Sequence, residues 1–268
     1  MKTQLFAGLS ALTAIALMLL VQAVQAEDLI AEAYDIKNVS ELVVSGGGRV
    51  QIVQGPTETL RVEAVKEVME RVRVDLSGGK LDLSVKHSAN KSFNLFDLFK
   101  QRNDDVLYIL QLKKLDYVGL SGASRASFGN WVDGNLTVNV SGAGVATFSN
   151  LKVNDLFVQL TGASNSQVQT LSATKVKLEL SGAANMEVKA AGKTNVLIID
   201  ASGASNYHGK LLNAVQADIE ASGASNIDIY ATEFLQARAS GASNIRYLGQ
   251  PKLKSNATGA SHIKAISD

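Results

Sequence analysis

Acidic side chains recur at a regular spacing in the second half of the chain. Glu179, Asp200 and Glu220 stand 21 and 20 residues apart, and Asp218 lies two residues before the last of them. Carboxylates brought close together favour a cation or a basic partner, and paired carboxylates are also the groups that hydrolyse glycosidic bonds. This acidic column is therefore the strongest candidate for a charged site. A solvated outer face would explain the same residues without any ligand.

Few other residues are suited to catalysis. His87, His208 and His262 are far apart, and none has a metal-ligand partner at helical spacing. The chain has no cysteine, and its many serines recur in turns without a neighbouring histidine, which disfavours a Ser-His-Asp arrangement. The glycine clusters are not followed by a helix that would bind phosphate. We therefore expect no catalytic residue, no metal site and no cofactor.

The elements that would position the acidic column are repeats of one short motif. Ser-Gly-Ala-Ser-Asn is complete at 202–206, 222–226 and 240–244, and variants of it occur at five other places. The central glycines, 18 to 21 residues apart, are Gly122, Gly142, Gly162, Gly182, Gly203, Gly223, Gly241 and Gly259. This period is typical of a solenoid, in which each repeat buries its apolar face by stacking on its neighbours.

Apolar and polar residues alternate before each glycine. Val138 and Val140 flank Asn139, for example, and this period of two indicates a strand with one buried face. A second alternating strand follows the glycine, and a third apolar side is indicated nine residues beyond it. That side contains Trp131, Leu151, Leu171 and Leu212. Three short sides in 18 to 21 residues predict an all-β fold, a single-stranded parallel β-helix whose coils stack about 4.8 Å apart.

The residues around each glycine indicate a tight corner. Glycine adopts corner conformations without a side-chain penalty, and we expect the alanine that follows it in all eight repeats to turn inward. One corner column is asparagine: Asn165, Asn185, Asn206, Asn226 and Asn244. Stacked amides can hydrogen-bond along the axis, so we interpret this column as a structural ladder rather than a row of ligand-binding amides. The calcium-binding β-roll is disfavoured because these corners contain no aspartate.

The beginning of the chain has the pattern of a secretory signal peptide. Lys2 precedes an apolar run from Leu5 to Val24, and Val24 and Ala26 provide small residues for cleavage after position 26. An uncleaved anchor helix is the alternative. After cleavage we expect no transmembrane segment, and a location in the periplasm, at the cell surface or outside the cell. The remaining 25 basic and 25 acidic residues balance, so nucleic acid is not an expected partner.

Residues 27–114 are rich in strands but lie outside the regular repeat, which covers 115–268. We expect 27–268 to form one continuous domain. Alternating segments, separated by turn signals, are predicted at 41–45, 49–53, 59–65, 71–76 and 80–85. They begin the β-helix and form a cap at its N-terminal end.

An insertion at 87–103 interrupts this pattern. Phe93, Phe96 and Phe99 recur there at a spacing of three, which predicts a short amphipathic helix with its rings on one face. The segment either covers the open end of the solenoid or forms a loop that contacts a partner or lipid. Both interpretations remain open.

Two aromatic residues are expected on the same outer face as the acidic column. Tyr117 and Phe157 project there by the glycine alignment, and exposed rings can stack on sugars. The candidate binding face therefore comprises Tyr117, Phe157, Glu179, Asp200, Asp218 and Glu220.

The export signal, the strand-rich start and the recurring SGASN motif together resemble the GIN-domain family, described as head domains of auto-transporter adhesins. The resemblance covers about 36–266, and Gly203 to Asn206 match its motif. It implies a right-handed β-helix in a bacterial envelope or secreted protein, with an adhesive role. The resemblance assigns no catalytic residue.

We therefore predict an exported, non-enzymatic binding or scaffold module of the bacterial cell envelope. Its flat outer sheet faces would bind a surface glycan, or an envelope or extracellular protein. One alternative is a β-helical carbohydrate-active enzyme, a polysaccharide lyase or hydrolase, which would need clustered carboxylates. A further alternative is a structural protein that stacks end to end.

Overall fold

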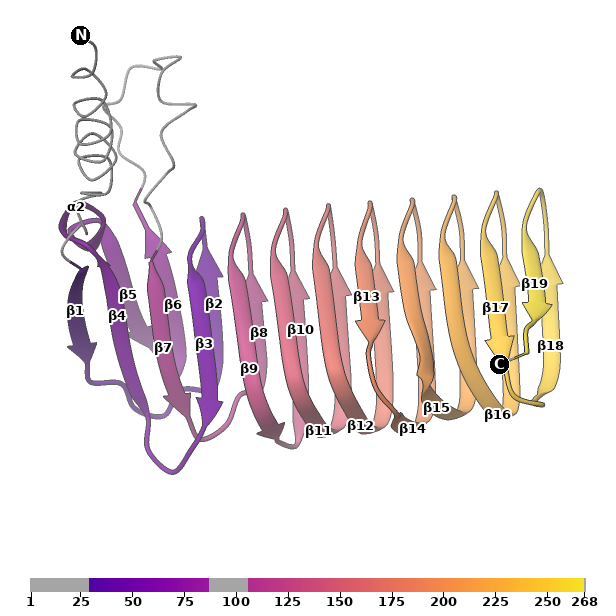
Figure 1. The fold of residues 1–268 in the computed structure, drawn as a ribbon, viewed down its shortest axis with the longest axis horizontal. Helices are drawn as coiled ribbons and strands as arrows, with labels where there is room; N and C mark the ends of the chain where they lie inside the picture. Colours follow the sequence, from indigo (N-terminus) through magenta and orange to yellow (C-terminus); the bar gives the residue numbers. More distant parts are fainter. Residues whose placement is uncertain (1–28, 87–105, 268) are drawn as a thin grey trace, which may run out of the picture.

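The computed structural model describes residues 29–86 and 106–267, and most of these form one long β-solenoid (Figure 1). The solenoid has about seven turns, and its strands form a single 19-stranded sheet that winds around the axis. The predicted all-β, parallel β-helical fold is confirmed. None of the described helical segments has the length and hydropathy to cross a lipid bilayer.

The regular coils begin at β8 and are built from parallel strands in register. Their bounds are β8 (Tyr117–Leu120), β9 (Arg125–Val132), β10 (Asn135–Val140), β11 (Val145–Leu160), β12 (Asn165–Leu180), β13 (Asn185–Val188), β14 (Gly192–Ala201), β15 (Asn206–Ala221), β16 (Asn226–Ala239), β17 (Asn244–Leu248), β18 (Lys252–Ala257) and β19 (His262–Ala265).

Each coil has three sides, as β11 illustrates. Its buried and exposed residues alternate, except at 149–150 and 154–155, where two consecutive residues are exposed. Each such pair reverses the alternation, so that the chain turns a corner and keeps its apolar side chains inside. We call the three sides by their order after the glycine corner: side 1 (145–149), side 2 (150–154) and side 3 (155–160). Equivalent residues of the other coils carry the same names.

Rows of apolar side chains, formed by equivalent positions of successive coils, fill the interior. The predicted third row is buried, since Trp131, Leu151 and Leu171 are each at most 1% exposed. The rings of Phe128 and Phe148 stack with centroids 4.4 Å apart, and Trp131 meets the first of them edge-on at 5.9 Å. Because each burial of a large apolar side chain contributes about 1.5–3 kcal/mol, these rows supply the main stabilisation of a chain without disulfides.

Glycine is required at the corner between sides 3 and 1. Gly203 has φ +73°, and a Cβ added there would lie 2.5 Å from the carbonyl oxygen of Gly182 in the preceding coil. That carbonyl accepts a hydrogen bond of 2.7 Å from the amide of Ala204, so the corners approach one another too closely for any side chain.

The orientation predicted for the corner alanine is wrong. Ala204 is exposed at the tip of the corner, whereas Ser205, the next residue, is fully buried. The Ser205 hydroxyl donates a 2.7 Å hydrogen bond to the carbonyl of Ser202, which satisfies it inside the core. The positive φ of the glycine places the following residue outside, and the chain points inward again one residue later.

The N-terminal part forms a cap in which the strand direction changes. Its elements are β1 (Leu29–Tyr34), β2 (Glu41–Ser45), β3 (Arg49–Gln54), β4 (Thr59–Val65), α2 (Lys66–Met69), β5 (Val72–Ser77), β6 (Lys80–Val85) and β7 (Leu107–Leu112). All five strands predicted here are present. β2 and β3 pair in parallel with β8 and β9 and so form a first coil, while β6 and β7 pair with their other edges.

Antiparallel strands then end the stack. β4 pairs with β7 and β1 on one side of the solenoid, and β5 pairs with β6 on another. The segment 87–105 lies in the connection between β6 and β7. In the next coil, the equivalent connection, between β2 and β3, is a glycine-containing corner. Phe93, Phe96 and Phe99 lie outside the described residues.

Candidate functional site

The six residues of the predicted binding face do share one face, the outer surface of side 3. Tyr117, Phe157 and Asp218 lie in one outward row, because their strands pair in register through β10, β12 and β14. Glu179, Asp200 and Glu220 form the neighbouring row.

Most carboxylates of this face are already paired. Lys177 Nζ lies 2.6 Å from Glu179, and Arg238 Nη2 lies 3.2 Å from Asp218 and 3.3 Å from Glu220. Asp200 has no ion-pair partner in the part of the chain that the structure describes. Within that part, no group of three or more His, Asp or Glu side chains is placed to bind a metal ion. The acidic column thus contains two separate sets of surface ion pairs, one within a coil at Glu179 and one between neighbouring coils at Arg238.

The two aromatic rings of side 3 are also engaged within the protein. Lys177 Nζ lies 5.1 Å from the centroid of the Phe157 ring, a cation–π distance. Tyr117 extends over the backbone of Gly119, and its hydroxyl accepts a 3.3 Å hydrogen bond from Asn139. Because two coil steps of about 4.8 Å separate the rings, they do not form a joint stacking platform.

A second row of polar side chains follows the outer surface of side 1, five residues after each glycine. We call it the polar row; its members, in register from coil to coil, are Gln51, Ser127, Thr147, Gln167, Glu187, His208, Asp228, Arg246 and Lys264. Its N-terminal half is neutral and its C-terminal half is charged. None of these residues belongs to the predicted binding face.

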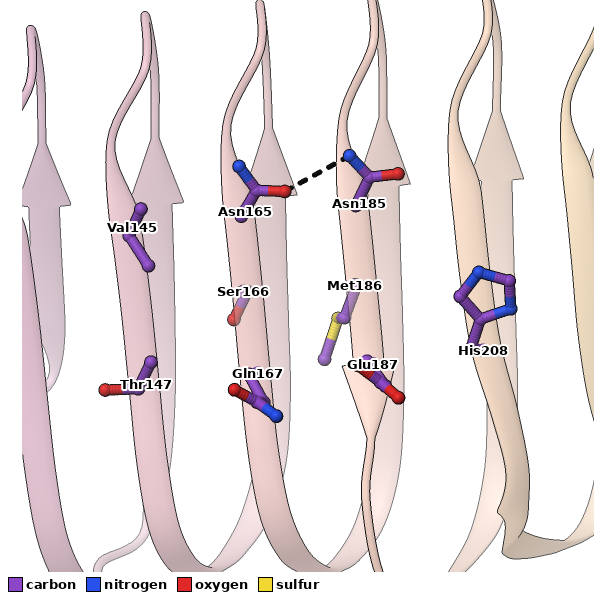
Figure 2. Close-up of a pocket in the computed structure, with 9 residues that line it drawn as sticks. All are labelled: Val145, Thr147, Asn165, Ser166, Gln167, Asn185, Met186, Glu187 and His208. Carbon is purple, nitrogen blue, oxygen red and sulfur yellow. Dashed lines mark hydrogen bonds between the residues drawn. The ribbon is translucent and has the colours of Figure 1, made fainter.

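A shallow groove runs beside the polar row (Figure 2). Its volume is about 210 Å³, and Thr147, Gln167, Glu187 and His208 line it from four successive coils. A second hollow of about 260 Å³ adjoins it toward the N-terminus. Thr147 and Gln167 line both hollows and stand between them, so that a hydroxyl and an amide group are accessible from either side of the polar row. Such groups both donate and accept hydrogen bonds.

The asparagine ladder borders the groove on the other side. Asn185 Nδ2 donates to Asn165 Oδ1 over 3.1 Å, as Figure 2 shows, and Asn206 donates to Asn185 over 2.8 Å. The same bond continues to Asn226 and Asn244. This is the ladder that the sequence predicted. Because each amide bonds to the next along the axis, the column stiffens the corner beside the groove.

A charged cluster lies at the C-terminal end of the groove. Asp228 is buried, with only 6% of its side chain exposed, and Arg246 donates to both of its oxygens over 2.6 and 2.8 Å. His208 Nδ1 lies 3.4 Å from the same carboxylate, and Lys210 Nζ lies 3.9 Å from it. Such bidentate bonds are the strong form of an ion pair. Glu187, in the preceding coil, pairs with Lys189 at 2.6 Å.

The pairing of His208 with Asp228 provides two members of a Ser-His-Asp arrangement, but not the third. No hydroxyl or thiol is hydrogen-bonded to His208 among the described residues. Arg246, Lys210 and His208 instead surround one buried carboxylate, that of Asp228.

The sequence contained the signal for this cluster. When the repeats are aligned on their glycines, Glu187, His208, Asp228 and Arg246 stand in one column. Searching for histidine partners at helical spacing missed it, because in a solenoid the neighbours of a side chain lie one whole repeat away.

This geometry defines a β-helical solenoid protein, and solved structures share the fold. A "putative adhesin" from Parabacteroides merdae has a TM-score of 0.77 at 16% identity, over 90% of this chain and 98% of that chain. A "putative adhesin" from Parabacteroides distasonis has 0.77 at 17% identity, and a "putative lipid binding protein" from the same species has 0.74 at 18%, with the same coverage. No curated protein matches the chain.

A family model described as "Putative auto-transporter adhesin, head GIN domain" matches residues 38–251. The chain belongs to this family, as the SGASN repeat indicated.

Proposed function

We propose that the protein is an exported, non-enzymatic binding module of the bacterial cell envelope, with an adhesin-like role. The observation that carries the proposal is the groove on side 1. It follows a flat sheet face across successive coils, and its lining combines hydroxyl and amide side chains such as Thr147 and Gln167 with apolar ones such as Val145. Membership of an adhesin-head family supports the same role.

The groove suits an extended ligand that lies along the axis of the solenoid. Equivalent side chains repeat about every 4.8 Å, so a polymer with a similar repeat can make the same contact on each coil. Many weak contacts of this kind add up through multivalency, without a deep pocket. Surface glycans and extended protein segments both have this form.

The alternatives have less support. A glycosidase needs an acid and a base on either side of a scissile bond, whereas Arg238 pairs with both Asp218 and Glu220. End-to-end stacking requires ends that match. At the N-terminal end, β7, β4 and β1 extend the sheet beyond β3, whereas only β6 and β5 extend it beyond β2. Because β4, β1 and β5 pair in antiparallel fashion, this end does not continue the parallel coil.

A glycan and matrix-protein array tests the proposal. Residues 27–268 are applied beside a variant that lacks residues 91–100, which distinguishes a contact loop from a cap. We expect saturable binding to one class of ligand. A blank array would contradict a binding role, and release of unsaturated or reducing ends from a polyuronate panel would contradict a non-enzymatic one.

A further inference from the structure

We propose that the side 1 groove binds an acidic polysaccharide, with its neutral hydroxyl groups over the N-terminal half of the polar row and its anionic groups at the C-terminal half. This inference rests on the proposed binding function and names its ligand class. We call the basic side chains at this end of side 1 the basic end; they are Arg246 and Lys264 of the polar row, the neighbouring Lys210, and His208.

The basic end has more cationic groups than its carboxylates can neutralise. Arg246 already satisfies both oxygens of Asp228, yet Lys210 and His208 also face that carboxylate. Lys264 follows Arg246 in the polar row and has no acidic partner among the described residues. From β13 to β19 the outer surface of side 1 thus carries Lys189, Lys210, Arg246 and Lys264 against Glu187 and Asp228.

The positive groups around Asp228 are more exposed than the carboxylate itself. Asp228 is only 6% exposed and accepts two hydrogen bonds from Arg246, while Lys210 and Arg246 are 42% and 47% exposed. The carboxylate therefore anchors the cluster and leaves positive groups at the surface. A cluster of like charge on a low-dielectric surface concentrates counter-ions and steers an anionic ligand toward it.

The outer surface of side 3 has a smaller excess of positive charge. From β12 to β18 it carries Glu179, Asp200, Asp218 and Glu220 against Lys175, Lys177, Arg238, Lys252 and Lys254. We therefore expect an anionic chain to be attracted more strongly to side 1 than to side 3. Substitutions on side 3 can serve as controls, because its strands belong to the same coils.

The chemistry of the groove favours a polysaccharide over a membrane or a peptide. Its polar lining groups include the half-buried Thr147 and Gln167 and the exposed Ser149, which can exchange hydrogen bonds with sugar hydroxyls, while Val145 adds an apolar contact for the face of a sugar ring. Five large apolar side chains are exposed on the described surface, and none lines either hollow: Leu29, Val53, Val132, Leu211 and Leu253. The coil spacing of about 4.8 Å is close to the length of one pyranose unit in an extended chain.

The test measures binding of residues 27–268 to polygalacturonate by titration calorimetry. The variant Lys210→Gln/Lys264→Gln removes two exposed charges from the basic end and leaves the Arg246–Asp228 bonds intact. The matched control, Lys175→Gln/Lys254→Gln, removes the same charge from outside side 1. Unfolding curves verify that both variants fold.

We expect the basic-end variant to bind about tenfold more weakly, or about 1.4 kcal/mol, and the control variant to bind like the parent. Binding should also weaken as salt is raised. Dextran sulfate distinguishes sulfate from carboxylate as the anionic group, and binding of either polymer that depends on the basic end supports the proposal.

Three results would overturn it: equal loss in both variants, equally tight binding of fully methyl-esterified polygalacturonate, or equally tight binding of poly-glutamate or anionic vesicles. Binding on the array to neutral glycans or proteins alone would refute the acidic ligand and leave the binding function standing. An array and a titration that are both blank would refute the two together.

Discussion

The phenol ring of Tyr207 lies over the backbone of Gly209, in the space that a side chain at position 209 would occupy. Both residues point into the core from side 1 of one coil. In the neighbouring coils the same two positions hold Met186 with Val188 and Ile227 with Ile229. Tyr207 is the largest of the inward residues at its position, and Gly209 is the smallest at the next inward position of the same coil. The total side-chain volume that the coil places in the core therefore stays nearly constant.

Replacing Gly209 with Ala should consequently destabilise the protein. The added methyl group collides with the Tyr207 ring, and overpacking of this kind costs about 1–3 kcal/mol. Urea denaturation measures the change. Gly47→Ala is the control, because no atom lies within 4 Å of a Cβ there, and it should alter stability by less than about 0.5 kcal/mol. If Tyr207→Val does not rescue Gly209→Ala, the collision is not the cause.

The hydroxyl of Tyr207 leads to a second prediction. It is buried and has no hydrogen-bond partner among the described residues, and burial raises the pKa of this phenol well above its usual value of about 10. A raised pKa means that the folded state favours the neutral phenol. The preference for the neutral phenol therefore contributes fully to stability below the unfolded-state pKa of about 10, and this contribution is lost as the pH rises through the folded-state pKa.

Tyr207→Phe should therefore be more stable than the parent by about 1 kcal/mol at neutral pH, because it removes an unpaired buried polar group. It should also unfold at a higher alkaline pH. Denaturation at neutral pH and an alkaline titration followed by tyrosinate absorbance measure both effects. Tyr117→Phe, at the surface, is the control. An unchanged alkaline limit would show that another group determines it.

The pairing of Arg246 with Asp228 predicts strong coupling between two strands that are one repeat apart. Arg246→Ala leaves a carboxylate with 6% exposure without its two shortest bonds. Since the guanidinium is itself about half exposed, solvent reduces the loss, and we expect about 1–3 kcal/mol. Asp228→Asn/Arg246→Ala should be less destabilised than the sum of the single changes. A double-mutant cycle measures this, and additive effects would contradict the coupling.

Much of the architecture could be predicted from the sequence because the repeat makes it redundant. Eight aligned glycines reveal the period, the alternation around Asn139 reveals the strands, and the column from Asn165 to Asn244 reveals the ladder. The direction of the cap strands β4 and β5 could not be predicted, because alternation indicates a buried face and not the direction of the neighbouring strand.

The charged contacts were harder to predict for a different reason. Arg238 neutralises Asp218 and Glu220 from one coil away, and the column of like charges in the sequence suggested repulsion instead. A side chain as long as arginine reaches two rows of the neighbouring coil, so its partners depend on rotamers as well as register. The inward turn of Ser205 depends on one positive φ at the preceding glycine, and composition alone does not show where the chain points after it.

Replacing the exposed residues of side 3 separates the two candidate faces. In a variant carrying Tyr117→Ser, Phe157→Ser, Glu179→Gln, Asp200→Asn and Glu220→Gln, three carboxylates are lost from side 3, and the basic end on side 1 is unchanged. Binding of polygalacturonate should be retained or slightly strengthened, because the repulsion of an anionic chain is reduced while Lys210 and Lys264 are untouched. Titration of this variant beside Lys210→Gln/Lys264→Gln gives the comparison. Loss of binding in the side 3 variant alone would place the ligand on Tyr117, Phe157 and the acidic column instead of in the groove.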